Sequence, residues 1–405
     1  MLIKRTKYIE WLTTWKNKHV IKVITGIRRS GKSTILNQYM NTLKQKNIIY
    51  YDFNDIELQE LTYKELYKKI IAQSKINVIN YIFLDEIQEI NEFEKCVISL
   101  FEHKTLKFDI VITGSNSKMF SAELATLFTG RNVEIHVLPL SFSEIHDFLR
   151  KNLKYDKKRN TDNEIFEHYL KYGGMPILLE IINNTSLIKN RLNKILDDVI
   201  DKDVRTRHKI KNVSEFKRIA QFIFDNNGNV TSTISIHNYL ISNKIGEITR
   251  PTLDNYQKWM MDSLIIYKNP YYDLKGKRVL NTSSKYYCVD TGIKNVNTNF
   301  KNEGKLLENI AFLELLRNNY EVYSLKLRNE KEIDFLIIKD HKKTYIQVAK
   351  NLDTEKIKNR EIGNLISIND NNRKIVIVCE GESYVDDNGI EIINIIDWLL
   401  GKVKI

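Results

Sequence analysis

The run from Gly26 to Ser33, GIRRSGKS, places two glycines, a lysine and a serine at the spacing G-x-x-x-x-G-K-[ST]. Glycines at these positions let consecutive backbone N–H groups turn inward around phosphate oxygens. Lys32 would then reach the terminal phosphates of a nucleotide, and the Ser33 hydroxyl would bind Mg²⁺. The run therefore predicts a phosphate-binding loop. Its nucleotide-binding residues would be Gly26, Ile27, Arg28, Arg29, Ser30, Gly31, Lys32, Ser33 and Thr34.

Two acidic residues, Asp85 and Glu86, end the apolar segment 80–86. A buried parallel strand delivers its last side chains to the ligand crevice at the carboxyl edge of its sheet. Asp85 would there hold Mg²⁺ directly or through water, and Glu86 would orient or deprotonate the attacking water. Such a pair also fits a solvated acidic turn, but its place after a phosphate loop favours catalysis.

Three further polar residues are candidates for the same site. Ser115 and Asn116 end the apolar segment 108–116, where either would hydrogen-bond the γ-phosphate or the lytic water, or else cap a helix. Arg131 precedes the strand-like segment 133–138 and would contact the nucleotide of a neighbouring subunit as an arginine finger. A surface salt bridge is the alternative for Arg131.

The elements that must position these residues are strands that alternate with helices. The phosphate loop follows a strand-like segment, 20–24, and opens into a helix-like one, 34–39. A helix N-terminus behind the loop adds partial positive charge. Segments 47–53 and 61–73 predict another strand and another helix. This alternation predicts a three-layer α/β sandwich with a mostly parallel sheet.

The segment 230–280 has the pattern of a winged helix-turn-helix. It predicts one helix at 234–240, a second beginning near Thr249, and then a hairpin. We expect the second helix to bury Leu253, Tyr256, Trp259 and Met260. As a DNA reader it would present Asn255, Gln257 and Lys258, with Lys275, Lys277 and Arg278 at the wing. Asp254 opposes DNA binding, so a packing module remains the alternative.

Near the C-terminus an acid on a helix, Glu308, is followed by a strand with Asp334 and a strand with Gln347. This order resembles the PD-(D/E)xK nuclease core, in which two acids hold Mg²⁺ and a lysine positions the nucleophile. Ala349 stands where that lysine belongs, and Lys350, one step further along the strand, faces the other side. We therefore expect an inactive scaffold.

Composition narrows the class of protein. The 63 basic and 51 acidic residues give a net charge of +12, which fits polyanionic partners or lysine-rich solvated faces equally well. Three separated cysteines suggest neither disulfides nor a zinc site. The N-terminus is too polar for a signal peptide, and no stretch reaches the ~18–20 apolar residues of a membrane span. We expect a cytoplasmic protein without a membrane partner.

Several motifs together are similar to those of bacterial and archaeal AAA-superfamily ATPases that carry a degenerate restriction-endonuclease-like C-terminal domain. They are GIRRSGKST (26–34), FLDEIQ (83–88), ITGSNS (112–117), TGR (129–131) and LPLSFSEI (138–145). The resemblance places Lys32 and Ser33 in Walker A, Asp85 and Glu86 in Walker B, and Ser115 or Asn116 at sensor 1. It implies ATP and Mg²⁺ as ligands.

The same resemblance, with the patterns above, divides the chain into four parts. We expect a P-loop AAA-type core at 1–150, a helical lid region at 151–215, a winged helix at 216–293 and an endonuclease-like domain at 294–405.

The leading functional hypothesis is a Mg²⁺-dependent ATPase that couples hydrolysis to a conformational change on a partner. DNA is one candidate partner, and an Arg131 finger would require a homo-oligomer. A DNA-binding adaptor with a non-hydrolysing nucleotide switch is the alternative, and an active metal-dependent nuclease ranks third.

Overall fold

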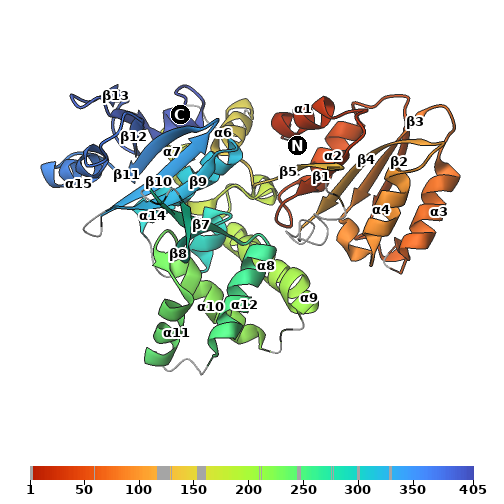
Figure 1. Ribbon diagram of the computed structural model, residues 1–405, viewed down its shortest axis with the longest axis horizontal. Coiled ribbons are helices and arrows are strands. Elements are labelled where there is room, and N and C mark those ends of the chain that lie inside the picture. The colour runs from red at the N-terminus through yellow and green to blue at the C-terminus, as the bar shows by residue number, and fades with distance from the viewer. Residues whose placement is uncertain are drawn as a thin grey trace. The chain divides into compact units, whose positions relative to one another are not determined.

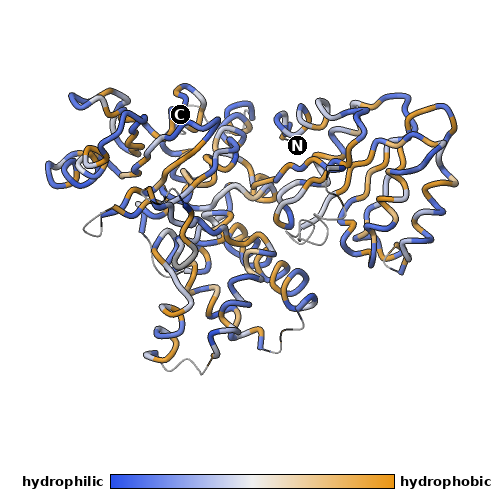
Figure 2. The backbone as a smooth tube through the Cα atoms, in the orientation of Figure 1, coloured by the Kyte–Doolittle hydropathy of each residue, from blue (hydrophilic) through white to orange (hydrophobic). Residues whose placement is uncertain are grey.

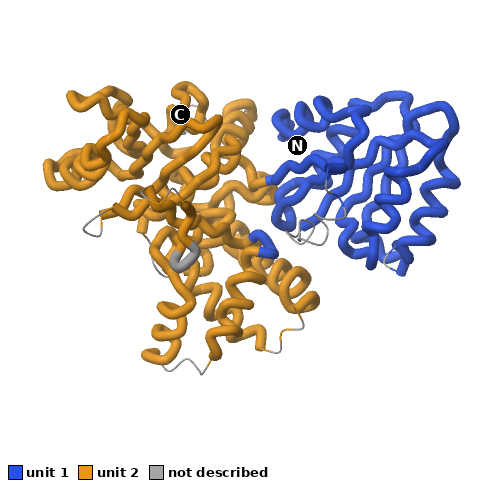
Figure 3. The backbone as a smooth tube through the Cα atoms, in the orientation of Figure 1, with its two compact units in different colours: residues 1–137, 262–264 blue, residues 138–261, 265–405 orange. Residues whose placement is uncertain are grey.

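The computed structural model describes residues 3–58, 60–115, 128, 130–152, 161–208, 210, 212–243, 248–274, 276, 278–298, 302–327 and 331–405, without the side chains of 281–283. The chain divides into two units, coloured separately in Figure 3. Unit 1 comprises residues 1–137 and 262–264, and unit 2 comprises residues 138–261 and 265–405. Each unit is described by itself.

A sheet of five parallel strands forms the centre of unit 1, with the order β2-β3-β4-β1-β5 (Figure 1). Its strands are β1 (Ile21–Thr25), β2 (Asn47–Asp52), β3 (Ile79–Asp85), β4 (Lys107–Gly114) and β5 (Asn132–His136). Because all five run in the same direction, their carboxyl ends meet at one edge. The phosphate loop, Asp85 and Ser115 follow or end strands at that edge.

Helices cover both faces of this sheet (Figure 1). One face packs against α1 (Thr6–Thr14) and α2 (Lys32–Met40), and the other against α3 (Tyr63–Gln73) and α4 (Phe93–Phe101). Neighbouring residues of β1 belong to opposite layers, because side chains alternate along a strand: Ile24 packs with α2 and Val23 with α4. Figure 2 shows the apolar stretches along these strands. The predicted three-layer sandwich is confirmed.

Unit 2 begins with a series of helices (Figure 1). They are α6 (Phe142–Lys151), α7 (Asp162–Tyr172), η4 (Pro176–Glu180), α8 (Thr185–Val199), η5 (Ile200–Arg205), α9 (Thr206–His208), α10 (Val213–Asp225), α11 (Thr233–Ser242), α12 (Arg250–Asp262) and α13 (Thr291–Val296). Local sequence explains several starts. Ser141 before α6 and Thr161 before α7 each form a capping box with a glutamate three residues later. No helix in the described ranges is both long and apolar enough to span a bilayer.

A nine-stranded mixed sheet completes unit 2, with the order β13-β14-β12-β11-β10-β9-β7-β8-β6. Its strands are β6 (Val230–Thr231), β7 (Ile266–Asp273), β8 (Arg278–Cys288), β9 (Glu321–Lys326), β10 (Glu332–Lys339), β11 (Lys342–Ala349), β12 (Arg373–Val378), β13 (Tyr384–Val385) and β14 (Glu391–Asn394). The accompanying helices are α14 (Glu303–Arg317), α15 (Glu355–Ile366) and α16 (Ile395–Leu399).

This sheet crosses the boundary expected at residue 293. Strands β6 to β8 belong to the expected winged helix and β9 to β14 to the expected endonuclease-like domain, yet β7 and β9 are neighbours. They pair in parallel through Tyr271 with Ser324 and Tyr272 with Leu325. The four-part division remains a prediction, and its last two parts share one sheet.

A buried carboxylate joins α7 to α13 within unit 2. Asp290 accepts hydrogen bonds from the backbone N–H groups of Gly174 (2.7 Å) and Ile293 (3.0 Å), so it caps α13 and holds the chain after α7. Burial raises the pKa of Asp290 to about 6, although these hydrogen bonds oppose the rise. The end of α7 and the start of α13 approach closely, because a Cβ added to Gly292 would lie 1.9 Å from the carbonyl oxygen of Tyr172.

Candidate nucleotide site and a second polar cluster

The loop after β1 wraps around the ammonium group of Lys32. Its Nζ donates to the carbonyl oxygens of Gly26 (2.9 Å) and Ile27 (3.3 Å), and the side chain is only 3% exposed. Gly26 has no room for a side chain, since an added Cβ would lie 2.3 Å from the Val137 carbonyl oxygen. The loop has the compact form that the motif predicts.

Ser30, inside this loop, gives an independent sign of a ligand. Its hydroxyl is completely buried and has no hydrogen-bond partner among the described residues. An unpaired buried hydroxyl is costly, so such an atom in a native fold calls for a partner. A phosphate oxygen, which accepts hydrogen bonds, fits this place next to the Lys32 ammonium.

Asp85, the last residue of β3, lies beside Ser33 in the first turn of α2. The Asp85 carboxylate accepts hydrogen bonds from the side chains of Ser33 and Thr113. Burial raises the pKa of Asp85, and a nearby cation would reverse that effect. A hydroxyl and a carboxylate are the hard oxygen ligands that Mg²⁺ prefers, so the pair fits this ion.

Glu86 follows in a left-handed backbone conformation, with φ of 55°. Its N–H donates to Thr113 Oγ1 (2.9 Å), and its Oε1 lies 3.0 Å from Lys32 Nζ. Burial alone would raise the pKa of Glu86, but Lys32 and Arg28 lower it to about 2. Glu86 is therefore ionised at neutral pH, as a proton acceptor must be.

The other residues predicted for this site do not all lie at the carboxyl edge of the sheet. Ser115 is buried at the end of β4, close to Glu86, whereas Asn116 lies outside the described residues. Arg28 pairs with Glu89 at 3.3 Å on the rim of the loop. Arg131 is not at this edge: its carbonyl oxygen accepts from the N–H of Ile21, the first residue of β1.

Arg131 therefore lies at the end of β1 opposite to the phosphate loop. Its side chain pairs with Glu102 at 2.8 Å, and both side chains are partly exposed. The structure thus shows the salt bridge that was the alternative for Arg131. A finger role toward a second subunit remains a prediction, and within its own chain Arg131 does not reach the site.

Sequence reasoning missed two residues that support the site. Arg5 is buried, and its Nη1 donates to the Ser30 carbonyl oxygen at 2.9 Å, so a buried cation supports the phosphate loop. Gln88 donates to Glu86 Oε2 at 2.5 Å. Neither belongs to the phosphate-loop spacing. Gln88 ends the FLDEIQ run (83–88) and lies two residues from Glu86, and these are the signals by which it could have been found.

Three regions of the chain match described families. Residues 18–146 match a family described as AAA domain, residues 163–304 match the domain of unknown function DUF8612, and residues 303–398 match DUF4143. An uncharacterized protein of Haemophilus influenzae is 35% identical over 98% of this chain and 99% of its own length. This chain belongs to the same family as that protein.

A second relative and a solved structure are also similar to this chain. Uncharacterized protein MJ1544 of Methanocaldococcus jannaschii is 34% identical to this chain over 84% of the chain and 77% of its own length. The Walker-type ATPase PABY2304 of Pyrococcus abyssi shares the fold, with a TM-score of 0.54, 17% identity, and coverage of 73% of this chain and 96% of that chain. The protein thus has the P-loop fold of AAA-type ATPases.

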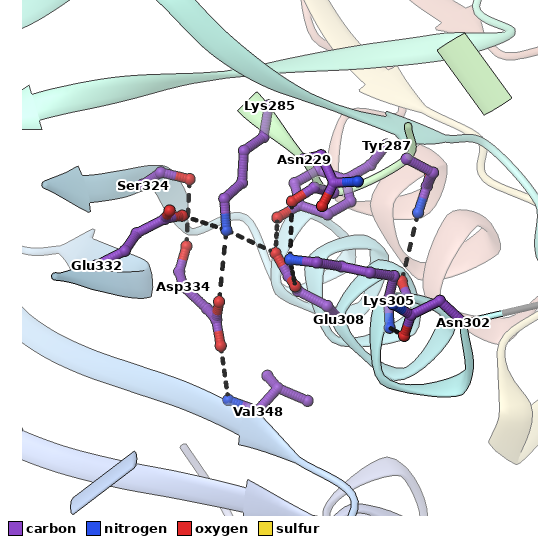
Figure 4. Close-up of polar contacts among 12 residues, drawn as sticks. Asn229, Lys285, Tyr287, Asn302, Lys305, Glu308, Ser324, Glu332, Asp334 and Val348 are labelled. Atoms are coloured by element: carbon purple, nitrogen blue, oxygen red, sulfur yellow. Dashed lines mark hydrogen bonds and ion pairs between the residues drawn. The ribbon is translucent and has the colours of Figure 1, made fainter. Parts of the chain in front are cut away.

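A second polar cluster surrounds Lys285 of β8 in unit 2 (Figure 4). Its Nζ lies 2.8 Å from Glu308 Oε1 and 3.4 Å from Asp334 Oδ1, and it also pairs with Glu332. Lys305 contacts the other oxygen of Glu308 at 2.6 Å. We call these five side chains the Lys285 cluster.

Charge explains how this cluster tolerates burial. The side chains of Lys285 and Glu308 are 2% and 4% exposed. Burial opposes the charge on Lys285, but Glu308 and the neighbouring acids raise its pKa well above the usual value. Burial raises the pKa of Asp334 to about 7, with Glu308 adding to the effect.

The predicted acids Glu308 and Asp334 do converge, but on a lysine that sequence reasoning missed. Gln347 contacts the backbone of Asp334 and a different acid. Its Oε1 accepts from the Asp334 N–H (2.7 Å), and its Nε2 donates to Glu361 Oε2 (2.8 Å). Lys350 pairs elsewhere, with Glu303 and Glu380. Among the described residues no group of three or more His, Cys, Asp or Glu side chains is arranged to hold a metal ion.

The expected DNA-reading helix, α12, requires one correction. Gln257 is buried and accepts a hydrogen bond from Thr233 Oγ1 at 3.2 Å, so it does not face solvent. It follows Leu253 by four residues, which places both on the inward face of a helix. Asn255 and Lys258 are exposed as expected, whereas Lys275 and Lys277 lie outside the described residues.

Proposed function

We propose that this protein is a Mg²⁺-dependent ATPase that couples hydrolysis to a conformational change on a partner. One observation carries the proposal: Lys32, Ser33, Asp85 and Glu86 converge at the carboxyl edge of one parallel sheet. Lys32 and Glu86 are 3.0 Å apart, and Ser33 contacts Asp85. These are a cation for phosphate, two oxygen ligands for Mg²⁺ and an ionised base for water.

Each side chain would have a distinct task. Lys32 would exchange its contact with Glu86 for oxygens of the terminal phosphates, and the Ser30 hydroxyl would donate to a phosphate oxygen. Ser33 and Asp85 would hold Mg²⁺, which when bound neutralises charge on the transferred phosphoryl group. Glu86 would orient the attacking water and accept its proton.

Two substitutions test this proposal. Lys32→Ala should abolish saturable binding of ATP, because the loop loses its phosphate-binding cation. Glu86→Gln should keep ATP binding but slow hydrolysis by ~100-fold or more, because an amide cannot accept the proton. Binding is measured with a fluorescent nucleotide, and turnover by phosphate release.

Lys95→Ala is the matched control, because Lys95 is exposed and its ammonium contacts Glu92 and the face of the Tyr63 ring, away from the loop. It should behave as wild type. Equal turnover by wild type and Glu86→Gln would remove Glu86 from its role. Absence of saturable adenine-nucleotide binding in the presence of Mg²⁺ would overturn the whole proposal.

DNA is the partner class supported by the net charge of +12 and by exposed Asn255 and Lys258 on α12. Phosphate contacts release counterions, so DNA binding would weaken steeply with salt. ATP turnover with and without DNA, at two protein concentrations, tests both DNA as a partner and assembly of subunits. DNA binding without any turnover would instead favour the adaptor with a non-hydrolysing switch.

A further inference from the structure

We propose that Gln88 is the positioning residue that aims Glu86 at the attacking water. This inference rests on the proposed ATPase activity and names a further residue of the same site. Gln88 would act by holding one oxygen of the Glu86 carboxylate and by connecting it to the end of strand β4. It would not itself touch the phosphates.

The Gln88 amide bridges the ends of two neighbouring strands. Its Nε2 donates to Glu86 Oε2 at 2.5 Å and lies 3.4 Å from Ser115 Oγ. Glu86 follows β3 and Ser115 follows β4, and these strands are paired along their length. The orientation of the amide is dictated by chemistry, because an ionised carboxylate accepts hydrogen bonds and cannot donate one.

The two oxygens of Glu86 therefore have partners of different kinds. Oε1 contacts the Lys32 ammonium at 3.0 Å, and Oε2 contacts the neutral amide of Gln88. A nucleotide phosphate competes with Glu86 for the ammonium group of Lys32. It does not displace the Gln88 amide, which is neutral and already bound to the carboxylate. When phosphate takes Lys32, Oε1 becomes available to water while Oε2 stays bound, so the carboxylate keeps its direction.

The backbone around Gln88 is arranged to hold it in place. Gln88 lies in the short 3₁₀ turn η2 (Ile87–Glu89), where the N–H of Glu89 donates to the carbonyl oxygen of Glu86 at 3.1 Å. Ile87 is completely buried in the core of unit 1 and anchors the turn. A side chain on such an anchored turn can orient its neighbour with little loss of conformational entropy.

The second atom of the same amide supports a role near water. Gln88 Oε1 is buried and has no hydrogen-bond partner in the part of the chain that the structure describes. A buried acceptor of this kind calls for a hydrogen-bond donor, and an ordered water is one that would fit. Water donates hydrogen bonds, so one molecule could donate to Gln88 Oε1 and to the freed Oε1 of Glu86.

The test compares Gln88→Ala and Gln88→Glu with wild type and with Glu86→Gln. Gln88→Ala should lower kcat by about 10- to 100-fold and leave KM and nucleotide Kd within about twofold of wild type. Gln88→Glu keeps the shape but replaces the donor with a second carboxylate, so it should lose at least as much. Gln73→Ala, which removes an exposed glutamine of the same unit, is the control and should keep full activity.

A double variant separates positioning from a merely structural role. If Gln88 acts only through Glu86, adding Gln88→Ala to Glu86→Gln should cause no further loss of kcat. An equal additional loss in that background would overturn the proposal, as would wild-type kcat in Gln88→Ala. Melting temperatures verify folding, and if Gln88→Ala does not fold, the isosteric Gln88→Glu decides the test by the same criteria.

The outcomes also separate this proposal from the one it rests on. If wild type turns over ATP and Glu86→Gln does not, while both Gln88 variants are fully active, only the role of Gln88 fails. If wild type neither binds nor hydrolyses ATP, the proposed function fails and the role of Gln88 falls with it. A changed Kd for ATP with unchanged kcat would show that Gln88 contacts the nucleotide, which also contradicts positioning.

Discussion

Two buried lysines perform opposite tasks in this protein. Lys32 contacts backbone carbonyls and a single glutamate, so a phosphate can compete for its charge. Lys285 is surrounded by Glu308, Glu332 and Asp334, so its charge is fully engaged within the chain. The first arrangement suits reversible binding of an anion. The second ties β8 to α14 and β10.

Removing the ammonium of Lys285 should therefore be costly. Lys285→Ala leaves three buried or half-buried acids facing one another, and loss of one partner from a buried ion pair costs about 3–5 kcal/mol. Lys350→Ala is the control, because Lys350 also bridges two acids but with its side chain 47% exposed, and should cost below about 1 kcal/mol. Denaturant titration measures both losses. Equal losses would show that the Lys285 cluster does not stabilise unit 2.

Among individual residues, the sequence predicts those whose chemistry depends on local spacing. Lys32 and Ser33 begin α2 directly after the phosphate loop, and Asp85 and Glu86 are consecutive residues at the end of β3, so a linear pattern predicts them. Linear patterns do not predict Arg5 or Lys285, because the fold alone brings their partners close. Gln88 is near Glu86 in the chain, but its contact with Ser115 also depends on the fold. Gln257 is predicted on the DNA-reading face but lies on the inward face, four residues after Leu253.

Among the elements, α7 and α13 pack closely at Gly292. Asp290 holds both segments, and the carbonyl of Tyr172 leaves no space beside Gly292. No pattern in the sequence predicts this contact, because residues 172 and 292 are far apart in the chain. The predicted segments 20–24 and 61–73 agree with β1 and α3 to within two residues, since alternation and helical spacing are local properties.

Two glycine substitutions should change stability in opposite directions. Gly292→Ala places a Cβ 1.9 Å from a backbone carbonyl oxygen, which should destabilise unit 2 by about 1–3 kcal/mol or more. Gly363→Ala, within α15, has no atom within 4 Å of the added Cβ and should stabilise by about 0.4–1 kcal/mol. Thermal melting distinguishes them, and a neutral Gly292→Ala would contradict the close approach.

For the whole molecule, the division into two units predicts where a nucleotide acts. Lys32, Asp85 and Glu86 all belong to unit 1. ATP with Mg²⁺ at about 100 times its Kd should stabilise that unit by about 2.7 kcal/mol. Hydrogen exchange should then slow in β1, α2 and β3, and Lys32→Ala should show no such change. Slower exchange confined to residues 138–261 and 265–405 would contradict the assigned site.

The nine-stranded sheet has a practical consequence for anyone who dissects this chain. The boundary between the two regions of unknown function falls near residue 303, within unit 2. A fragment that starts there would carry Glu308, Glu332 and Asp334 without their counter-charge from β8. It would also expose the side of β9 that β7 covers through Tyr271 and Tyr272. Unpaired strand edges invite self-association, so recombinant work on the C-terminal half is best begun at residue 138.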